Sequence, residues 1–366
     1  MTILIFLVVL VVLVIVHELG HFALAKMFRM RVDEFGVGFP PRLASLRRGE
    51  TEYSLNLFPF GGFVRIFGED PAEEVTGPGA ERSFARSTKV AQAFVLVAGV
   101  AANVLFAWVL LSAVFMLGMP TDARDTRFGE AADVRLTVTG VLPDSPAEHA
   151  GLHAGDRITS LTAGDSSLGT PTPEGVTSFF ETHRPGTVTL DIVRGEATLR
   201  VDAQPTTGLF QTEPEKVGIG ISMGEIGTVT LSFGSAFAAG GALTFSTFGD
   251  IAVGLGQFFV QALSLNADLS TVAGPVGIAT MVGDASALGS VHLLVFAAFI
   301  SLNLAVINLI PFPALDGGRL LFVGIEAATR RTVPLHAFRL MNIIGFALLI
   351  LLMVVVTYHD IARLVA

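Results

Sequence analysis

The chain has 366 residues, of which 51% are hydrophobic and 15% are charged, with a net charge of −9 and no cysteine. A soluble protein of this size carries roughly 25% charged residues, so the composition predicts several membrane spans joined to a smaller soluble part. The acidic balance argues against nucleic acid as a partner. Without cysteine there can be no disulfide framework, no cysteine zinc site and no thiol nucleophile.

Residues 1–28 predict a transmembrane helix, because positions 3–16 contain only Leu, Ile, Val and Phe. The segment lacks the basic start and the small-residue cleavage site of a secretory signal peptide. We therefore expect this helix to be retained.

The first helix carries a His-Glu-Leu-Gly-His motif at its polar end. Helix positions i and i+4 share a face, so His17 and His21 can bind one metal ion with Glu18 beside them as a general base. Ionisable side chains are costly in hydrocarbon and are therefore usually functional there. The alternative is a pair of histidines packed within a helix bundle.

Residues 29–89 predict a cytoplasmic, membrane-associated β-hairpin region and a loop. Aromatic and aliphatic residues alternate between glycine turns from 32 to 67, a pattern typical of short hairpins. We expect these hairpins to enter the membrane interface near the metal; the alternative is an ordinary soluble hairpin. Residues 69–80 have the composition of a flexible loop.

Residues 90–118 predict the second transmembrane helix, with small residues before Asn103 that allow close helix packing.

Residues 119–226 predict an extracytoplasmic region. Within it, the strand and helix patterns of about 131–205 predict a compact α/β module, and the run 141–158 resembles PDZ domains of bacterial membrane proteases. Such domains bind an extended peptide as an added strand. A rigid spacer without a ligand is the alternative.

Residues 227–286 predict an interfacial helical region. Its apolar part is interrupted by glycines and Asp250, which favours a helix at the interface over a fifth span. Residues 287–316 predict the third transmembrane helix, 317–336 a cytoplasmic loop, and 337–366 the fourth helix with the C-terminus.

Lys and Arg are concentrated between spans one and two and between spans three and four. The positive-inside rule makes both loops cytoplasmic, so both termini and the PDZ module lie outside and the metal site lies near the cytoplasmic side. A fifth span would reverse the C-terminal half. The predicted fold is thus a polytopic α-helical membrane protein with four transmembrane helices, a membrane-associated β-hairpin region and one inserted extracytoplasmic α/β PDZ domain.

A catalytic zinc needs three protein ligands and an open position. Asp316 is the best candidate for the third ligand. It follows two prolines, which end span three and leave backbone groups without helix partners. At membrane depth such backbone must be buried or line a wet cavity, and we expect Asp316 to face a cavity shared with the HExxH motif. The alternative role for Asp316 is a turn residue before Gly317 and Gly318.

The HExxH motif in span one and the Asn-x-x-Pro-x-Pro-x-Leu-Asp-Gly segment from position 308 together resemble the site-2 protease family of intramembrane zinc metalloproteases. The single PDZ module is similar to the bacterial RseP-like branch, although some members carry two. The resemblance implies His17, His21 and Asp316 as ligands of one catalytic Zn²⁺, Glu18 as the general base, and Asn308 as a substrate-positioning residue.

The resemblance also implies hydrolysis of peptide bonds within or near the transmembrane segment of single-span proteins, in a bacterial inner or plasma membrane. Anti-sigma factors and signal-peptide remnants are the implied substrates. Asn103 and Asn303 fit helix-packing hydrogen bonds better than catalysis. Two other functions fit some of these residues: a catalytically silent membrane PDZ scaffold, and a zinc transporter.

Overall fold

The computed structural model describes residues 1–365 apart from 71–74, 77–78, 196, 210–214 and 265–272. The chain divides into two compact units. One comprises Met1–Ser112, Gly240–Ser286 and Leu293–Ala366, and the other comprises Ala113–Ala239 and Ala287–His292. The predicted loop at 69–80 lies partly outside the described residues.

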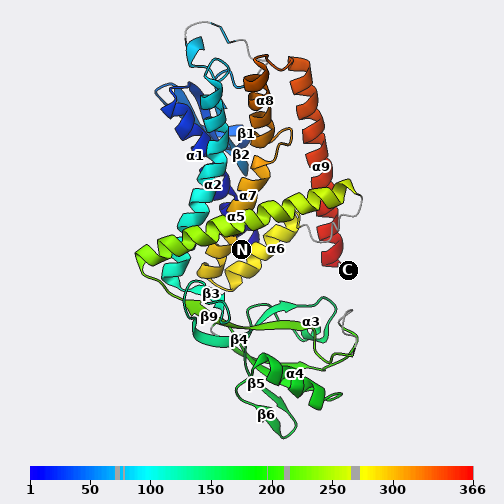
Figure 1. The fold of residues 1–366 in the computed structure, drawn as a ribbon. Coiled ribbons are helices and arrows are strands. Elements are labelled where there is room, and N and C mark those ends of the chain that lie inside the picture. Colours follow the sequence, from blue (N-terminus) through cyan, green and yellow to red (C-terminus); the bar gives the residue numbers. More distant parts are fainter. Residues whose placement is uncertain (71–74, 77–78, 196, 210–214, 265–272, 366) are drawn as a thin grey trace. The chain divides into compact units, whose positions relative to one another are not determined.

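The first unit consists of long helices and one small sheet (Figure 1). Its helices are α1 (Thr2–Met27), α2 (Lys89–Leu117), α5 (Phe233–Leu263), α6 (Pro275–Ala287), α7 (Ser290–Leu309), α8 (Asp316–Thr329) and α9 (Leu335–Val365), with a 3-10 turn η1 (Ala80–Arg82). Five of the described helices (α1, α2, α5, α7 and α9) are long and apolar enough to cross a membrane. Helix α8 falls in the expected cytoplasmic loop; its amphipathic sequence buries Phe322 and Val323 on one face.

Helix α5 has the lowest hydropathy of these five. It runs across α2 and α7 rather than alongside them (Figure 1). Gly240 allows close contact with α2, because a Cβ there would lie 2.4 Å from the Ser112 Oγ. The residues joining the three helices are Ala107 and Leu111 of α2, Leu243, Phe248 and Ile251 of α5, and Ala298 and Leu302 of α7.

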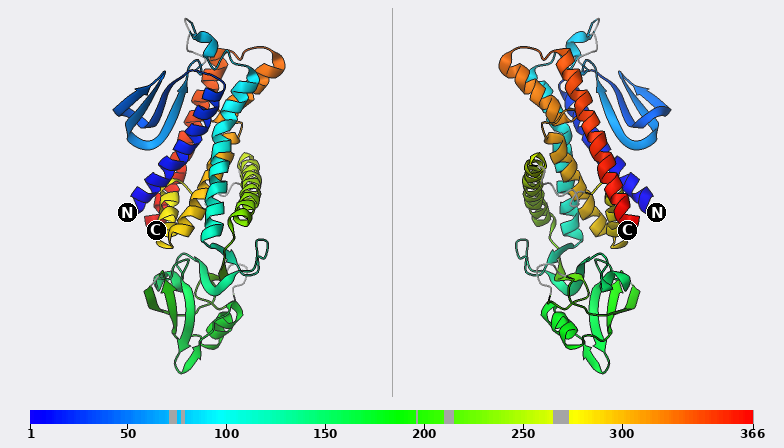
Figure 2. Two further views of the ribbon diagram at one scale, coloured as in Figure 1. Left: turned by 90° about the vertical axis from the view of Figure 1, so that its left-hand side faces the viewer. Right: turned by 90° about the vertical axis from the view of Figure 1, so that its right-hand side faces the viewer.

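The small sheet is one long, bent hairpin of β1 (Val32–Arg48) and β2 (Thr51–Ile66), where the sequence predicted several short hairpins. Phe35 pairs with Tyr53 on one side and with Val64 on the other, so the start of β1 lies between the two halves of β2. Figure 2 shows this curled sheet beside α1, and the Phe22 ring of α1 packs edge-on against Phe35 at 5.5 Å. One edge of the sheet is therefore the segment 62–66.

The second unit contains an antiparallel sheet in the order β3-β9-β4-β5-β7-β8, with β6 paired to β5. Its strands are β3 (Met119–Asp122), β4 (Ala132–Val141), β5 (Arg157–Ala163), β6 (Ser166–Leu168), β7 (Val188–Arg194), β8 (Ala197–Ala203) and β9 (Ile221–Val229), and its helices are α3 (Pro146–His149) and α4 (Pro173–Thr182). Val176 and Phe180 of α4 pack on the buried face of the sheet.

Within the soluble module, the sequence predicts strands at 136–141, 156–161, 188–193 and 197–201 and helices at 144–148 and 174–182. All are present, as β4, β5, β7 and β8 and as α3 and α4. The sequence had not predicted β9, which pairs with β4 and so belongs to the same sheet. Its glycines, Gly224 and Gly227, weaken the alternation by which strands are recognised.

Candidate active site

The HExxH residues lie on the buried side of α1. His17 and His21 are 7% and 8% exposed, and their rings meet edge to face at 4.7 Å. Their Nε2 atoms are 3.1 Å apart. One helical turn therefore directs both imidazoles to a single point, as the i, i+4 spacing predicts.

Asp316 reaches the same point from the other end of the sequence. Helix α7 ends at Leu309, before the two prolines, and α8 begins with Asp316. The Asp316 Oδ2 lies 3.0 Å from the His17 Nε2 and 3.2 Å from the His21 Nε2. Asp316 is the first residue of α8 rather than a turn or cap residue, and its carboxylate faces the two histidines.

The donor set fits zinc. Two imidazole nitrogens and one carboxylate oxygen lie within 4.8 Å of one another. Two histidines and a carboxylate form a common catalytic zinc set, with the fourth position left for water or substrate. His21 Nδ1 is 2.8 Å from the Val95 carbonyl oxygen and donates to it, which leaves its Nε2 lone pair for a metal.

Asn103 of α2 orients the other imidazole. It is fully buried, and its side-chain nitrogen is placed 3.3 Å from the His17 Nδ1, while its Oδ1 has no partner among the described residues. Exchanging the amide nitrogen and oxygen puts an acceptor at His17 Nδ1, so that His17 can donate from Nδ1 and keep its Nε2 lone pair for a metal. Asn103 then orients His17 as Val95 orients His21. The sequence analysis had favoured a packing hydrogen bond for this residue.

Two glycines let α1 and α2 approach closely enough to form this site. A Cβ on Gly99 would lie 2.3 Å from the His21 Nε2, and a Cβ on Gly20 would lie 2.3 Å from the Ala98 carbonyl oxygen. Any larger residue at Gly99 would occupy the space of the imidazoles. The small-residue run before Asn103 predicted close packing, but it could not predict which residue faces the histidines.

Glu18 is half-buried and lines a cavity of about 190 Å³ together with the metal-ligand candidates. The edge segment of the sheet forms one wall, and a Cβ on Gly62 would lie 3.5 Å from the Glu18 Cγ. The remaining described lining residues are Phe63, Val64, Ile66, Glu69 and Arg319. A carboxylate beside a three-ligand site in a small cavity is placed to exchange protons with water.

Glu69 and Arg319 are cavity residues that the sequence analysis did not identify. Arg319 forms an ion pair with Glu69 and also donates to the Glu69 carbonyl oxygen at 2.8 Å. Glu69 Oε2 in turn accepts the Ile66 backbone N–H at 3.2 Å. The only signal in the sequence is the position of Arg319 directly after the Asp-Gly-Gly segment.

Asn308 is half-buried near the end of α7, and the described lining residues of the cavity do not include it. Asn303 donates to the Phe299 carbonyl oxygen at 2.9 Å within α7. That bond lies within one helix and is not the contact between helices that the sequence suggested for Asn303.

Comparisons with known proteins identify the family of the chain. The model of Peptidase family M50 matches residues 5–352. A protein of Clostridium perfringens is 34% identical over 358 residues, covering 95% of each chain. A protein named zinc metalloprotease RasP from Oceanobacillus iheyensis is 30% identical and covers 96% of this chain and 97% of its own. One of the same name from Geobacillus kaustophilus is 28% identical, with 98% and 97% covered.

The chain belongs to Peptidase family M50, the site-2 type of membrane zinc metalloproteases. It is a multi-pass membrane protein and an intramembrane zinc protease, as the resemblance implied. A solved PDZ domain from Listeria monocytogenes aligns with 24% of this chain and 86% of its own length, at 23% identity and a TM-score of 0.21. That similarity is too low to establish the fold of the second unit.

Proposed function

We propose that His17, His21 and Asp316 hold the zinc ion and that Glu18 is the general base. The observation that carries this assignment is the meeting of the three donor atoms beside Glu18 in one cavity. Zinc bound there supplies Lewis acidity, which lowers the pKa of water and polarises a carbonyl group. Glu18 accepts a proton from the attacking water and returns it to the leaving amine.

The substrate is a single-span membrane protein whose scissile segment binds in extended form. An α-helix engages its carbonyl groups in internal hydrogen bonds, so the segment must unwind before hydrolysis. The edge 62–66 of the β1–β2 sheet borders the cavity and supports binding of such a segment as an added strand. Asn308 positions the substrate carbonyl. Anti-sigma factors and signal-peptide remnants fit this substrate class.

The protein crosses the bacterial inner or plasma membrane four times, through α1, α2, α7 and α9. The crossing of α2 and α7 by α5 supports an interfacial place for α5. The basic segments between spans one and two and between spans three and four are cytoplasmic, and the termini and the second unit lie outside. The cytoplasmic segments then include the β1–β2 sheet, near the active site.

The second unit is a PDZ domain that binds an extended peptide. A groove of about 610 Å³ lies between α4 and residues 216–223. On the groove side, β9 pairs with β3 only at 226–229 among the described residues, which leaves its first half available as an edge. A screen of peptides against the full chain tests this role, and an absence of saturable binding would favour the spacer.

Replacing Glu18 by Gln tests the protease assignment. In reconstituted vesicles containing a tagged single-span substrate, we expect cleavage to fall at least ~100-fold while zinc content is retained. Asp316→Ala should instead lower zinc content. A Glu18→Gln variant that still cleaves with zinc bound would refute the mechanism. Among the described residues, one group of His and acidic side chains, His17, His21 and Asp316, is close enough to share a metal ion. A zinc transporter would need further ligands along its path, so this arrangement does not support that alternative.

A further inference from the structure

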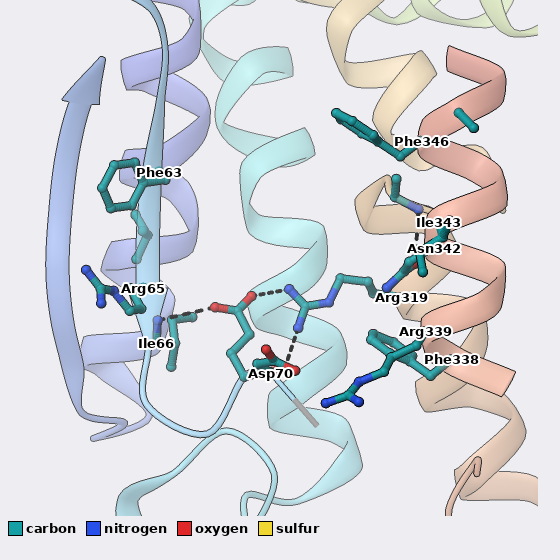
Figure 3. Close-up of a pocket in the computed structure, with 14 residues that line it drawn as sticks. Phe63, Arg65, Ile66, Asp70, Arg319, Phe338, Arg339, Asn342, Ile343 and Phe346 are labelled. Atoms are coloured by element: carbon teal, nitrogen blue, oxygen red, sulfur yellow. Dashed lines mark hydrogen bonds and ion pairs between the residues drawn. The ribbon is translucent and has the colours of Figure 1, made fainter. Parts of the chain in front are cut away.

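Helix α9 contacts the loop that carries Asp316 at two points. The Asn342 Oδ1 accepts the Ala314 backbone N–H at 3.3 Å. One turn further, Gly345 faces Pro313 so closely that a Cβ would lie 2.6 Å from both its Cβ and its carbonyl oxygen. Figure 3 shows Asn342 directed from α9 toward this loop.

The loop cannot hold this conformation by regular secondary structure. Two of its residues are prolines without an N–H, and Ala314 has φ 73°, in the left-handed region that a residue with a Cβ adopts at a cost. Within the loop, Phe312 donates to the Ile310 carbonyl oxygen at 2.7 Å, and Leu315 donates to the Phe312 carbonyl oxygen at 3.2 Å. The strained residue itself is fixed by Asn342.

The other side of the loop has no room to move. A Cβ on Gly317 would lie 2.2 Å from the Ile310 carbonyl oxygen, and a Cβ on Gly318 would lie 2.2 Å from the Phe312 carbonyl oxygen. The loop is therefore clamped between the first turn of α8 and the face of α9. We therefore expect a displacement of Pro313 to move Asp316, three residues later.

We propose that Asn342 and Gly345 are positioning residues that set the place of the Asp316 carboxylate through this loop. The inference rests on the proposed ligand role of Asp316, whose Oδ2 meets the His17 Nε2 at 3.0 Å. Asn342 fixes the conformation of Ala314, and Gly345 fixes the distance between α9 and the loop. Both act on metal binding through Asp316.

The same turns of α9 border a second pocket of about 1250 Å³ (Figure 3). Ile343 and Phe346 line it from α9, and Phe63 and Ile66 line it from the sheet edge. Asn342 itself lines this pocket and is half-buried. The acceptor oxygen of Asn342 can be removed by a substitution that keeps the volume of the side chain.

The test measures zinc affinity of the full chain in nanodiscs by chelator competition. Asn342→Leu keeps the volume and removes the acceptor, and we expect zinc affinity to fall by roughly tenfold, as for other groups that orient metal ligands. Asn342→Asp keeps an acceptor oxygen and should bind zinc like the wild type. With the natural substrate class, kcat should fall in Asn342→Leu while KM stays unchanged.

Gly345→Ala should weaken zinc binding by at least as much, because the added methyl group must displace Pro313 or α9. Gly324→Ala in α8 is the matched control, since a Cβ there meets nothing within 4 Å. The zinc-free Asn342→Leu and Gly324→Ala variants should unfold at the same temperature as the zinc-free wild type. If Gly345→Ala fails to fold, the comparison of Asn342→Leu with Asn342→Asp still tests the inference.

Wild-type zinc affinity in Asn342→Leu would overturn the inference, as would a loss of thermal stability without a change in zinc affinity. Asp316→Ala separates this failure from that of the proposed function. If Asp316→Ala binds zinc as tightly as the wild type, the ligand assignment itself is wrong. If only Asp316→Ala loses zinc, the ligand assignment stands and the positioning role of α9 is refuted.

Discussion

The sheet of the second unit and the outer half of the β1–β2 sheet, residues 39–58, bury opposite kinds of side chain. In β7, Val188, Leu190 and Ile192 are fully buried and alternate with more exposed residues, as in a sheet with one face in water. In the outer half of the β1–β2 sheet, Leu43 and Leu46 are 61% and 69% exposed. The same half buries polar side chains, Ser54 and Asn56 among them.

This difference is what different surroundings of the two sheets would produce. Apolar side chains that gather on one surface mark an interaction site or a lipid-facing surface. A sheet that encloses polar groups and exposes apolar ones is stable where its outer surroundings are apolar. The comparison therefore supports the expected position of the β1–β2 sheet in the membrane interface, whereas the sheet of the second unit has the pattern of a protein surface in water.

Truncating one leucine in each sheet gives the largest expected contrast. Leu190→Ala should destabilise the second unit by about 2–5 kcal/mol, because it leaves a cavity in a packed core. Leu46→Ala should change the stability of the first unit by less than about 0.5 kcal/mol, since no packed contact is lost. Hydrogen exchange of the full chain in nanodiscs measures both. Equal losses would show that Leu46 packs inward and would break the comparison.

Removing the carboxylate at the centre of the buried polar group should have a smaller but clear effect. Glu34 is 4% exposed, accepts the Ser54 hydroxyl at 2.6 Å and the Arg42 Nη2 at 3.0 Å, and pairs with Arg65. Glu34→Ala should cost roughly 1.5–3 kcal/mol, the range for hydrogen bonds to a charged group. Faster hydrogen exchange at amides 51–56 would report it.

Asp191→Ala is the control for Glu34→Ala. Asp191 lies on the wet face of the other sheet, where it pairs with Arg200 at 2.9 Å. Because water can replace that partner, we expect little change in the exchange of β7 and β8. A loss as large as that of Glu34→Ala would mean that the polar groups of both sheets are equally shielded from water.

The sequence predicted the parts of this fold that repeat a local pattern. The apolar run before His17, the i, i+4 histidines and the strands around Leu161 and Leu190 are set by neighbouring residues, so periodicity reveals them. The place of Asp316 beside His17 depends on a loop far along the chain, and a resemblance to known proteases was needed to connect the two. Both sequence and structure then place these residues in one site.

Other features depend on packing that no local pattern encodes. Gly99 is one glycine among several small residues, and only the crossing of α1 and α2 shows that it faces the imidazoles. The Arg319–Glu69 ion pair joins residues 250 positions apart. The burial of Glu34 could not be predicted either, because an acidic residue in a strand ordinarily indicates a solvent-facing position.

The smallest expected effect concerns Glu50, in the turn between β1 and β2. Glu50 accepts Arg82 at 2.8 Å and Lys26 at 2.7 Å, and these bonds, Arg82 first, lower the pKa of its carboxyl group to about 2. A lowered pKa in the folded state stabilises the protein above the ordinary value of 4.5, and this stabilisation is lost as the pH falls toward 2. The side chain is 34% exposed, so the pair should contribute only about 0.2–1 kcal/mol.

Glu50→Gln should therefore lower the unfolding temperature slightly at pH 7, and the difference from the wild type should shrink through pH 4 and vanish near pH 2. Thermal unfolding of both proteins in the same detergent measures this. A constant difference at every pH would mean that the substitution acts through packing rather than charge. A difference far larger than an exposed ion pair can produce would mean that the turn lies in apolar surroundings. The pattern of buried polar and exposed apolar side chains would then extend to the end of the β1–β2 sheet.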